Sequence, residues 1–276
     1  MNESVVVYRR FMFFRVALYL CLAAIIAYAW HRPLGMPNGG TWLGYGLGSI
    51  GAILILWLMY LGIRKRTYGP GKVKLEAWVS AHIYLGLSLL VIVTLHTGFR
   101  FGMNLHTLAY ALMLVVIASG CFGLYAYLRY PLLMTENRRG IALDNMLAQI
   151  ADIDRECREV SMQLGEEINR AVLVASQNTR IGGGVLQQLS GVDPKCPTSR
   201  ALKTVEQMAG QAAGNQAGDL RRLSTLLTRK EELLRRARRD VQIVALMRVW
   251  LFVHVPVSFA LLAALIAHVV SVFFYW

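Results

Sequence analysis

The sequence predicts an all-α membrane protein: a bundle of five transmembrane helices with a cytoplasmic antiparallel coiled-coil hairpin inserted between helices four and five. Apolar residues make up 56% of the 276 residues, and the mean hydropathy is +0.45, which is too high for an ordinary soluble domain. Five apolar stretches can cross a hydrocarbon core about 30 Å thick. The predicted domains are 1–129 with helices one to four, 130–246 with the hairpin, and 247–276 with helix five.

The first predicted span covers residues 11–30. A cleavable signal peptide is the alternative, because Ala27-Tyr28-Ala29 resembles an A-x-A cleavage site. The apolar run is long for a signal peptide and Arg15 interrupts its start, so a retained helix is favoured. The second span covers residues 42–63 and ends at Arg64-Lys65-Arg66.

The third span covers residues 77–97 and the fourth covers 106–128. The fourth contains Ser119-Gly120 and Gly123, small residues that allow a second helix or a cofactor to approach closely. The fifth span covers residues 247–276. Each is long enough to cross a bilayer as a helix.

Lys and Arg are concentrated in the segments after spans two and four, including Lys72 and Lys74, whereas Arg32 and Arg100 are the main charges after spans one and three. The positive-inside rule therefore predicts a cytoplasmic N-terminus and an outer C-terminus, in a membrane such as the bacterial inner membrane. This topology accounts for the net charge of +13 without a nucleic-acid partner. It also makes spans three and five run in the same direction.

The insertion 130–246 has two apolar series at alternating steps of three and four residues, the pattern of a coiled-coil seam. The only exception in the second series is Lys230. Residues 178–200 contain three consecutive glycines and two prolines and are predicted to form the irregular tip of the hairpin. The two series are Leu143, Met146, Ile150, Ile153, Cys157, Val160, Leu164, Ile168 and Ala171, and Leu220, Leu223, Leu227, Leu234, Ala237, Val241 and Val244.

One motif, W-x3-H-x13-H, occurs twice. It gives Trp78, His82 and His96 in span three, and Trp250, His254 and His268 in span five. A step of fourteen residues leaves the two histidines of each helix roughly 40° apart in rotation and about 21 Å apart along the axis. Parallel spans three and five therefore pair His82 with His254 and His96 with His268.

Two facing imidazoles are a standard axial ligand pair for haem iron. The motif therefore predicts two b-type haems (haem b), with the iron of each bound by one of these pairs. A zinc site is disfavoured because its ligands lie within a few Å of each other, and the four scattered cysteines provide no motif for c-type haem or an iron–sulfur cluster. A polar network or proton relay is the alternative for each single histidine.

Other candidate residues are weaker. Arg100 on the outer side and Arg248 on the inner side are candidate partners for the haem propionates, although topology alone also explains their charge. His31 and His106 fall near outer loops and are expected at the surface. No catalytic residue is predicted.

On the four spaced histidines, the membrane part resembles the transmembrane domain of the ferric reductase and NADPH-oxidase superfamily. The resemblance implies that helices three and five bind two haems stacked across the bilayer, through His82, His96, His254 and His268. It covers about half of the chain. A sixth helix and a Rossmann-like G-x-G-x-x-G context are absent from this sequence, so electron transfer is implied without built-in NADPH oxidation.

The expected function is transmembrane electron transfer, as the membrane subunit of a redox complex. The expected partners are membrane lipid, a cytoplasmic redox protein docking at the hairpin, and a quinone or an outer-side redox protein. Two alternatives stay open: a quinol-oxidising or metal-reducing membrane oxidoreductase, and a non-redox scaffold or receptor whose hairpin binds a partner.

Overall fold

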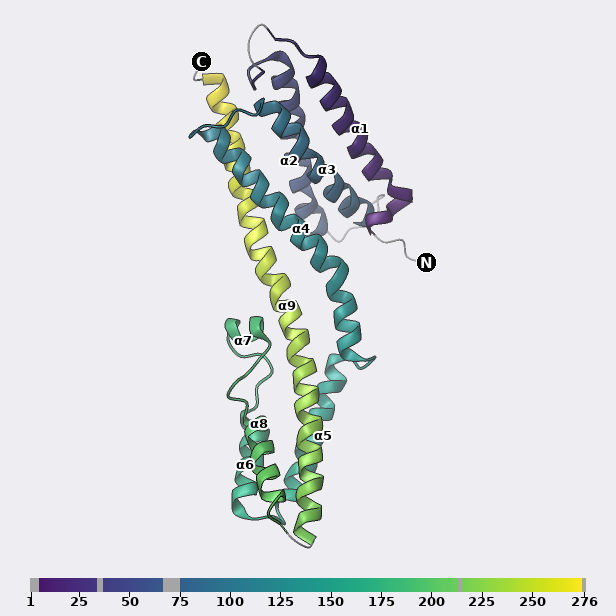
Figure 1. The fold of residues 1–276 in the computed structure, drawn as a ribbon, viewed down its shortest axis with the longest axis vertical. Helices are drawn as coiled ribbons and strands as arrows, with labels where there is room; N and C mark the ends of the chain where they lie inside the picture. The colour runs from purple at the N-terminus through teal and green to yellow at the C-terminus, as the bar shows by residue number, and fades with distance from the viewer. Residues whose placement is uncertain (1–4, 34–36, 67–74, 213–214, 275–276) are drawn as a thin grey trace. The chain divides into compact units, whose positions relative to one another are not determined.

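The computed structural model describes residues 5–33, 37–66, 75–212 and 215–274. The described residues are 85% helical, and no strand occurs in these ranges (Figure 1). Lys72 and Lys74, used in the topology prediction, lie outside them. The helices are α1 (Tyr8–Trp30), α2 (Trp42–Arg66), α3 (Leu75–Thr97), α4 (Leu105–Arg138), α5 (Leu143–Ser161), α6 (Glu166–Asn178), α7 (Val185–Ser190), α8 (Pro197–Ala209) and α9 (Asn215–Phe274).

Five of the described helices are long and apolar enough to cross a membrane, the number that the sequence predicts. They are α1, α2 and α3, with stretches of α4 and α9. Only 11% of the most apolar window of α1, α4 and α9 is buried inside the protein. An apolar surface left uncovered to this extent suits contact with lipid.

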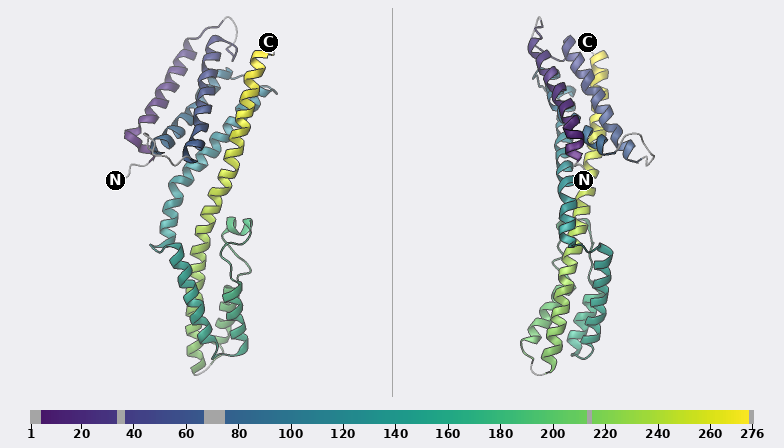
Figure 2. Two further views of the ribbon diagram at one scale, coloured as in Figure 1. Left: turned by 180° about the vertical axis from the view of Figure 1, so that it is seen from behind. Right: turned by 90° about the vertical axis from the view of Figure 1, so that its right-hand side faces the viewer.

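Two helices run further than their apolar stretches. The prediction ends the fourth span at residue 128, but α4 continues through Pro131 to Arg138. The fifth span belongs to α9, which begins at Asn215 and stays helical through Pro256 (Figure 2). A proline removes one backbone hydrogen bond from a helix without having to end it.

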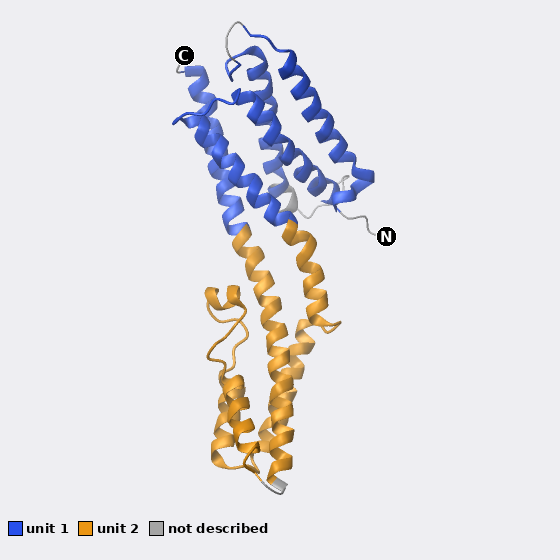
Figure 3. Ribbon diagram, in the orientation of Figure 1, with its two compact units in different colours: residues 1–124, 251–276 blue, residues 125–250 orange. Residues whose placement is uncertain are grey.

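The chain divides into two compact units (Figure 3). Unit 1 comprises residues 1–124 and 251–276. Within it α3 packs against both α1 and α2. Four helices contribute to one shared apolar core, whose most buried members are Ile55, Leu58, Leu89, Met113 and Leu261.

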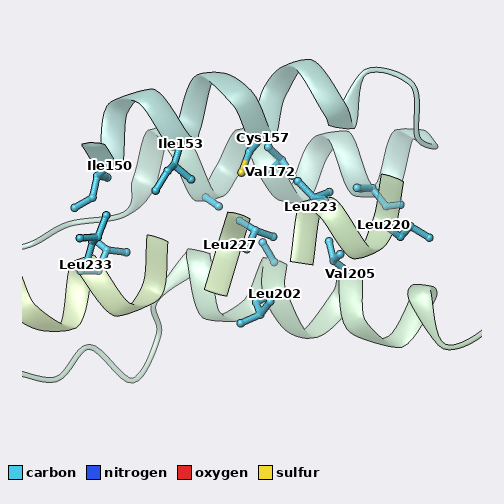
Figure 4. Close-up of a cluster of buried hydrophobic side chains, with 14 of the residues drawn as sticks. Ile150, Ile153, Cys157, Val172, Leu202, Val205, Leu220, Leu223, Leu227 and Leu233 are labelled. Atoms are coloured by element: carbon cyan, nitrogen blue, oxygen red, sulfur yellow. The ribbon is translucent and has the colours of Figure 1, made fainter. Parts of the chain in front are cut away.

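Unit 2 comprises residues 125–250 and contains the whole predicted insertion. One hydrophobic core joins α5, α6, α8 and the first half of α9 (Figure 4). Most of the predicted seam is in it, including Met146, Ile150 and Cys157 of α5 and Leu223 and Leu227 of α9. The first series lies entirely in or against this core, whereas the second does so only in part, because Val244 is 39% exposed. The coiled-coil pairing itself stays a prediction.

The prediction that residues 178–200 are irregular is wrong in part, because α7 and the start of α8 lie there. Pro197 occupies the start of α8, where its fixed φ favours a helix and its missing N–H costs nothing. Ala201, Leu202 and Val205 of α8 then enter the core. The seam residues therefore pack against α8 as well as against each other.

Lys230, the exception in the seam, is a buried cation with a carboxylate partner. Its side chain is 1% exposed. Nζ donates to Asp154 Oδ1 over 2.5 Å and to the Ala175 carbonyl over 2.9 Å. These bonds to α5 and α6 offset part of the cost of removing the charge from water.

Breaking this pair should destabilise unit 2. We expect Asp154→Ala to cost about 3 kcal/mol, because it leaves the Lys230 ammonium buried without a counter-ion. The measurement is the rate at which Cys157, fully buried in the same core, is alkylated in a full-length chain lacking the other three cysteines. Arg155→Ala is the matched control, since its ion pair with Asp152 is exposed and should change stability by less than about 0.5 kcal/mol. Equal labelling rates in the two variants would contradict the assignment.

Candidate functional site

The four histidines of the repeated motif all lie in unit 1. His82 and His96 are on α3, and His254 and His268 are on α9. Each pair on one helix is fourteen residues apart, about 21 Å along the axis. The site therefore has two levels, and the side chains at each level come from both helices.

At one level the rings of His96 and His268 are neighbours in an edge-on, T-shaped arrangement. Their centroids are 6.0 Å apart and their planes are at 88°. Metal–imidazole bonds of about 2 Å put the two ligating nitrogens about 4 Å apart, and each ring centroid lies about 1 Å further out. The observed spacing is therefore close to that of two imidazoles on one metal ion.

At the other level His82 interacts electrostatically with His254. The first histidine of each motif is thus near the first of the other, and the second is near the second. Within unit 1, α3 and the 251–274 part of α9 must therefore run in the same direction. The sequence predicted this pairing from topology alone.

A backbone hydrogen bond fixes the tautomer of His96. Its Nδ1 lies 2.8 Å from the Gly44 carbonyl oxygen of α2. A carbonyl can only accept, so Nδ1 carries the proton and the lone pair of the neutral ring is on Nε2. A ligating histidine commonly has its second nitrogen held by a carbonyl in this way.

Glycines make room for the His96 ring. A Cβ placed on Gly48 would lie 2.7 Å from His96 Cε1, and one on Gly39 would lie 3.1 Å from the same atom. Both distances are shorter than ordinary contacts between carbon atoms. The ring therefore sits against bare backbone of α2 and the segment before it.

A hydroxyl fixes the tautomer of His254. Its Nδ1 lies 2.7 Å from Ser119 Oγ on α4, and the same hydroxyl is 2.9 Å from the Val116 carbonyl. A hydroxyl has one proton, and the carbonyl can only accept it. The Ser119 oxygen therefore accepts from Nδ1–H, which again places the lone pair on Nε2. A Cβ on the adjacent Gly120 would meet His254 Cε1 at 3.7 Å.

His106 is exposed, as the sequence analysis expects, but it also contacts a motif histidine, which the sequence analysis does not predict. It lies on α4, its ring centroid is 4.5 Å from that of His268, and the two Nδ1 atoms are in hydrogen-bond contact. This contact gives Nδ1 of His268 a partner, as Gly44 does for His96 and Ser119 does for His254. The only sequence signal for this contact is the position of His106 at the start of span four, level with the end of span three.

The level of His82 contains polar atoms without partners. His82 Nδ1, Ser80 Oγ and Trp78 Nε1 are buried and make no hydrogen bond within the described ranges. Trp78 stacks on Trp57 of α2 with centroids 5.0 Å apart, so it packs inside unit 1 in addition to any role as a boundary anchor. A buried polar atom without a partner costs about 1–3 kcal/mol, which makes the His82 nitrogen a candidate ligating position.

The two arginines proposed for the propionates are both exposed. Arg100 is in the loop after α3, where its backbone N–H donates to the Thr97 carbonyl. Arg248 is on α9 within unit 2. His31 packs edge-on against Trp42, with centroids 5.1 Å apart and a buried Nε2. None of these contacts involves the four motif histidines.

The ligand set suits a haem better than a bare metal ion. In the part of the chain that the structure describes, no group of three or more His, Cys, Asp or Glu could hold a metal ion. A haem needs only two axial protein ligands because the porphyrin provides four nitrogens. The spacing of His96 and His268 and the Nδ1 partners of His96 and His254 are compatible with such ligation.

Comparison of the chain with protein-family models, with curated proteins and with solved structures gives no match. The function is therefore inferred from the residues of this chain.

The close approach at Gly48 has a direct test. We expect Gly48→Ala to lower the melting temperature, because its Cβ would overlap the His96 ring and overpacking costs about 1–3 kcal/mol. Gly46→Ala is the matched control on the same helix, since nothing lies within 4 Å of its Cβ position and alanine favours a helix by about 0.5–1 kcal/mol. Circular dichroism of the full chain in detergent compares them. A Gly48→Ala protein as stable as the Gly46→Ala protein would exclude this packing.

Proposed function

We propose that the protein transfers electrons across a membrane through two bis-histidine b-type haems. His82 and His254 would hold one haem, and His96 and His268 the other. The observation that carries the proposal is the arrangement of the imidazoles: His96 lies beside His268, His82 lies near His254, and Nδ1 of three rings is engaged by Gly44, Ser119 and His106.

Each hydrogen bond has a chemical consequence for its histidine. The Nδ1–H bonds of His96 and His254 put the lone pairs on Nε2 and make these nitrogens more basic. They also hold the ring planes, which reduces the entropy lost when a ligand is bound. For His82, the buried unpartnered Nδ1 marks a nitrogen that would gain most from coordination.

Held by these residues, each haem would supply a one-electron couple. Two histidines for each haem would favour a relay of electrons over a reaction of a substrate at the iron. The two levels are about 21 Å apart along α3 and α9. That spacing covers most of a hydrocarbon core about 30 Å thick, so two stacked redox groups give a stepwise path across it.

The chain's charges suggest where partners bind. In the topology proposed here, unit 2 is cytoplasmic, the N-terminus is also inside, and the C-terminus is outside, as expected for the bacterial inner membrane. Unit 2 would then be the docking surface for a soluble redox protein. A quinone or an outer-side redox protein would meet the His96–His268 level. Arg100 and Arg248 are proposed only as candidate propionate partners at the two ends.

The pairing predicts which substitutions act together. Replacing His82 or His254 with Ala should remove the same haem, and replacing His96 or His268 should remove the other, because loss of one axial ligand opens one site. Haem content and redox titration of the four full-length variants measure this. A shared phenotype of His82→Ala and His268→Ala would contradict the parallel arrangement. Quinone-dependent haem reduction in the isolated wild-type protein would favour a quinol-oxidising enzyme over a simple relay.

Ser119 should tune one potential without holding the haem. We expect Ser119→Ala to raise the midpoint potential of the His82–His254 haem, because a less basic His254 stabilises the oxidised iron less. Redox titration in the wild type and the variant measures the shift. Ser258→Ala is the control, since Ser258 Oγ donates to the His254 backbone carbonyl and leaves the ring untouched. Equal shifts in both variants, or a shift of the other haem, would contradict the hydrogen-bond assignment.

A further inference from the structure

A polar cavity of about 320 Å³ lies in unit 2, and none of the motif histidines lines it. The end of α6, the loops on either side of α7, the start of α8 and one side chain of α9 enclose it. Its lining combines four cationic side chains with amides and a few small apolar groups. The lining residues are Asn178, Arg180, Ile181, Gly182, Gln187, Val192, Asp193, Lys195, Pro197, Arg200 and Arg238.

The cavity lining is strongly positive. Arg180, Lys195, Arg200 and Arg238 contribute four positive charges, and Asp193 contributes the only carboxylate of the lining. That carboxylate is already used: Oδ1 accepts from the Lys195 backbone N–H at 3.2 Å, and Oδ2 lies 3.5 Å from Arg238 Nη2. Three positive charges are therefore left uncompensated by the lining.

Several of these cations have N–H groups that donate to no acceptor within the described ranges. Arg238 is held by the Arg180 carbonyl through Nε and Nη2, and its Nη2 also reaches Cys196 Sγ at 3.3 Å. Within the described ranges its Nη1 donates to nothing. The Arg180 guanidinium and the Lys195 ammonium likewise make no hydrogen bond there, whereas Arg200 donates one, to the Lys195 carbonyl at 2.7 Å. Cationic donors gathered around a cavity are typical of an anion site.

The Cys196 thiol lies beside the cavity, and the cationic lining affects its pKa. Burial raises the pKa of Cys196, but the Arg238 guanidinium and the backbone N–H groups of Ser199 and Thr198 lower it by more, so the pKa falls below its usual value. Cys196 is 2% exposed. A negative charge is thus stabilised at this edge of unit 2 in spite of burial, which is unusual for an interior position.

The geometry points to a binding site for a small phosphate-bearing anion in this cavity. Guanidinium forks and an ammonium match the several oxygens of a phosphate group. The volume is at the lower end of the range of about 300–1,000 Å³ found for small-molecule sites. No aromatic ring lines the cavity, and its small volume favours a compact ligand. The ligand is a compact phosphate ester, either a soluble metabolite or a phospholipid headgroup.

Titration calorimetry with inorganic pyrophosphate tests the site, on the full chain in nanodiscs of zwitterionic lipid. We expect saturable binding at one site. Lys195→Gln and Arg200→Gln should each weaken it about tenfold, because each removes a charge-assisted contact. Both side chains are exposed and make no contact with the core, so the variants should fold. Arg222→Gln is the matched control: an equally exposed arginine of the same unit that does not line the cavity.

Binding lost in the two cavity variants and kept in Arg222→Gln supports the site. Absence of saturable binding, or equal weakening in all three variants, overturns it. Glycerol 3-phosphate and dihexanoyl phosphatidic acid then distinguish the two sources, since both present a phosphate on glycerol. Tighter binding of the acylated compound identifies a headgroup, and equal binding identifies a soluble ester. The readout needs no haem, so its outcome is separate from that of the proposed electron transfer.

Discussion

The hydrogen bonds at Nδ1 of three of the four motif histidines are the interactions on which the arrangement of unit 1 depends. An imidazole among apolar helices keeps two polar nitrogens away from water, and each one without a partner costs about 1–3 kcal/mol. The Gly44 carbonyl, the Ser119 hydroxyl and His106 satisfy one nitrogen on three of the four rings. Because the partners come from α2 and α4, these bonds also fix how α3 and α9 are rotated against their neighbours.

The same requirement accounts for the small residues around the rings. The carbonyl of Gly44 can reach His96 only if α2 comes close, and the missing side chain of Gly48 permits that approach. In unit 2 the buried polar groups form ion pairs instead. Lys230 pairs with Asp154, and Asp240 pairs with Arg138 and accepts from Asn137. Ion pairs of this kind suit a domain that folds in water, whereas neutral rings and carbonyls suit an apolar bundle.

Local patterns in the sequence were enough for the helical class, the five apolar helices, the seam residues such as Met146 and Leu227, and the order in which the histidines pair. Contacts between helices were harder to foresee. His106 and Gly44 meet the motif histidines only after α2 and α4 take particular rotations, which apolar helices with little amphipathic character do not encode. Pro197 was interpreted as a breaker although it starts a helix. Lys230 looked like a fault in the seam because Asp154, its partner, is 76 residues away.

The central claim is that the paired imidazoles hold two haems, and the absorption spectrum of the purified full chain tests it most directly. Expression with ample haem, followed by a reduced-minus-oxidised difference spectrum and haem quantification, should give b-type bands and two haems per chain. Conversion of the four histidines to alanine should remove both. A colourless wild-type protein, without b-type bands under these conditions, would contradict the account and leave the histidines as a polar network within the bundle.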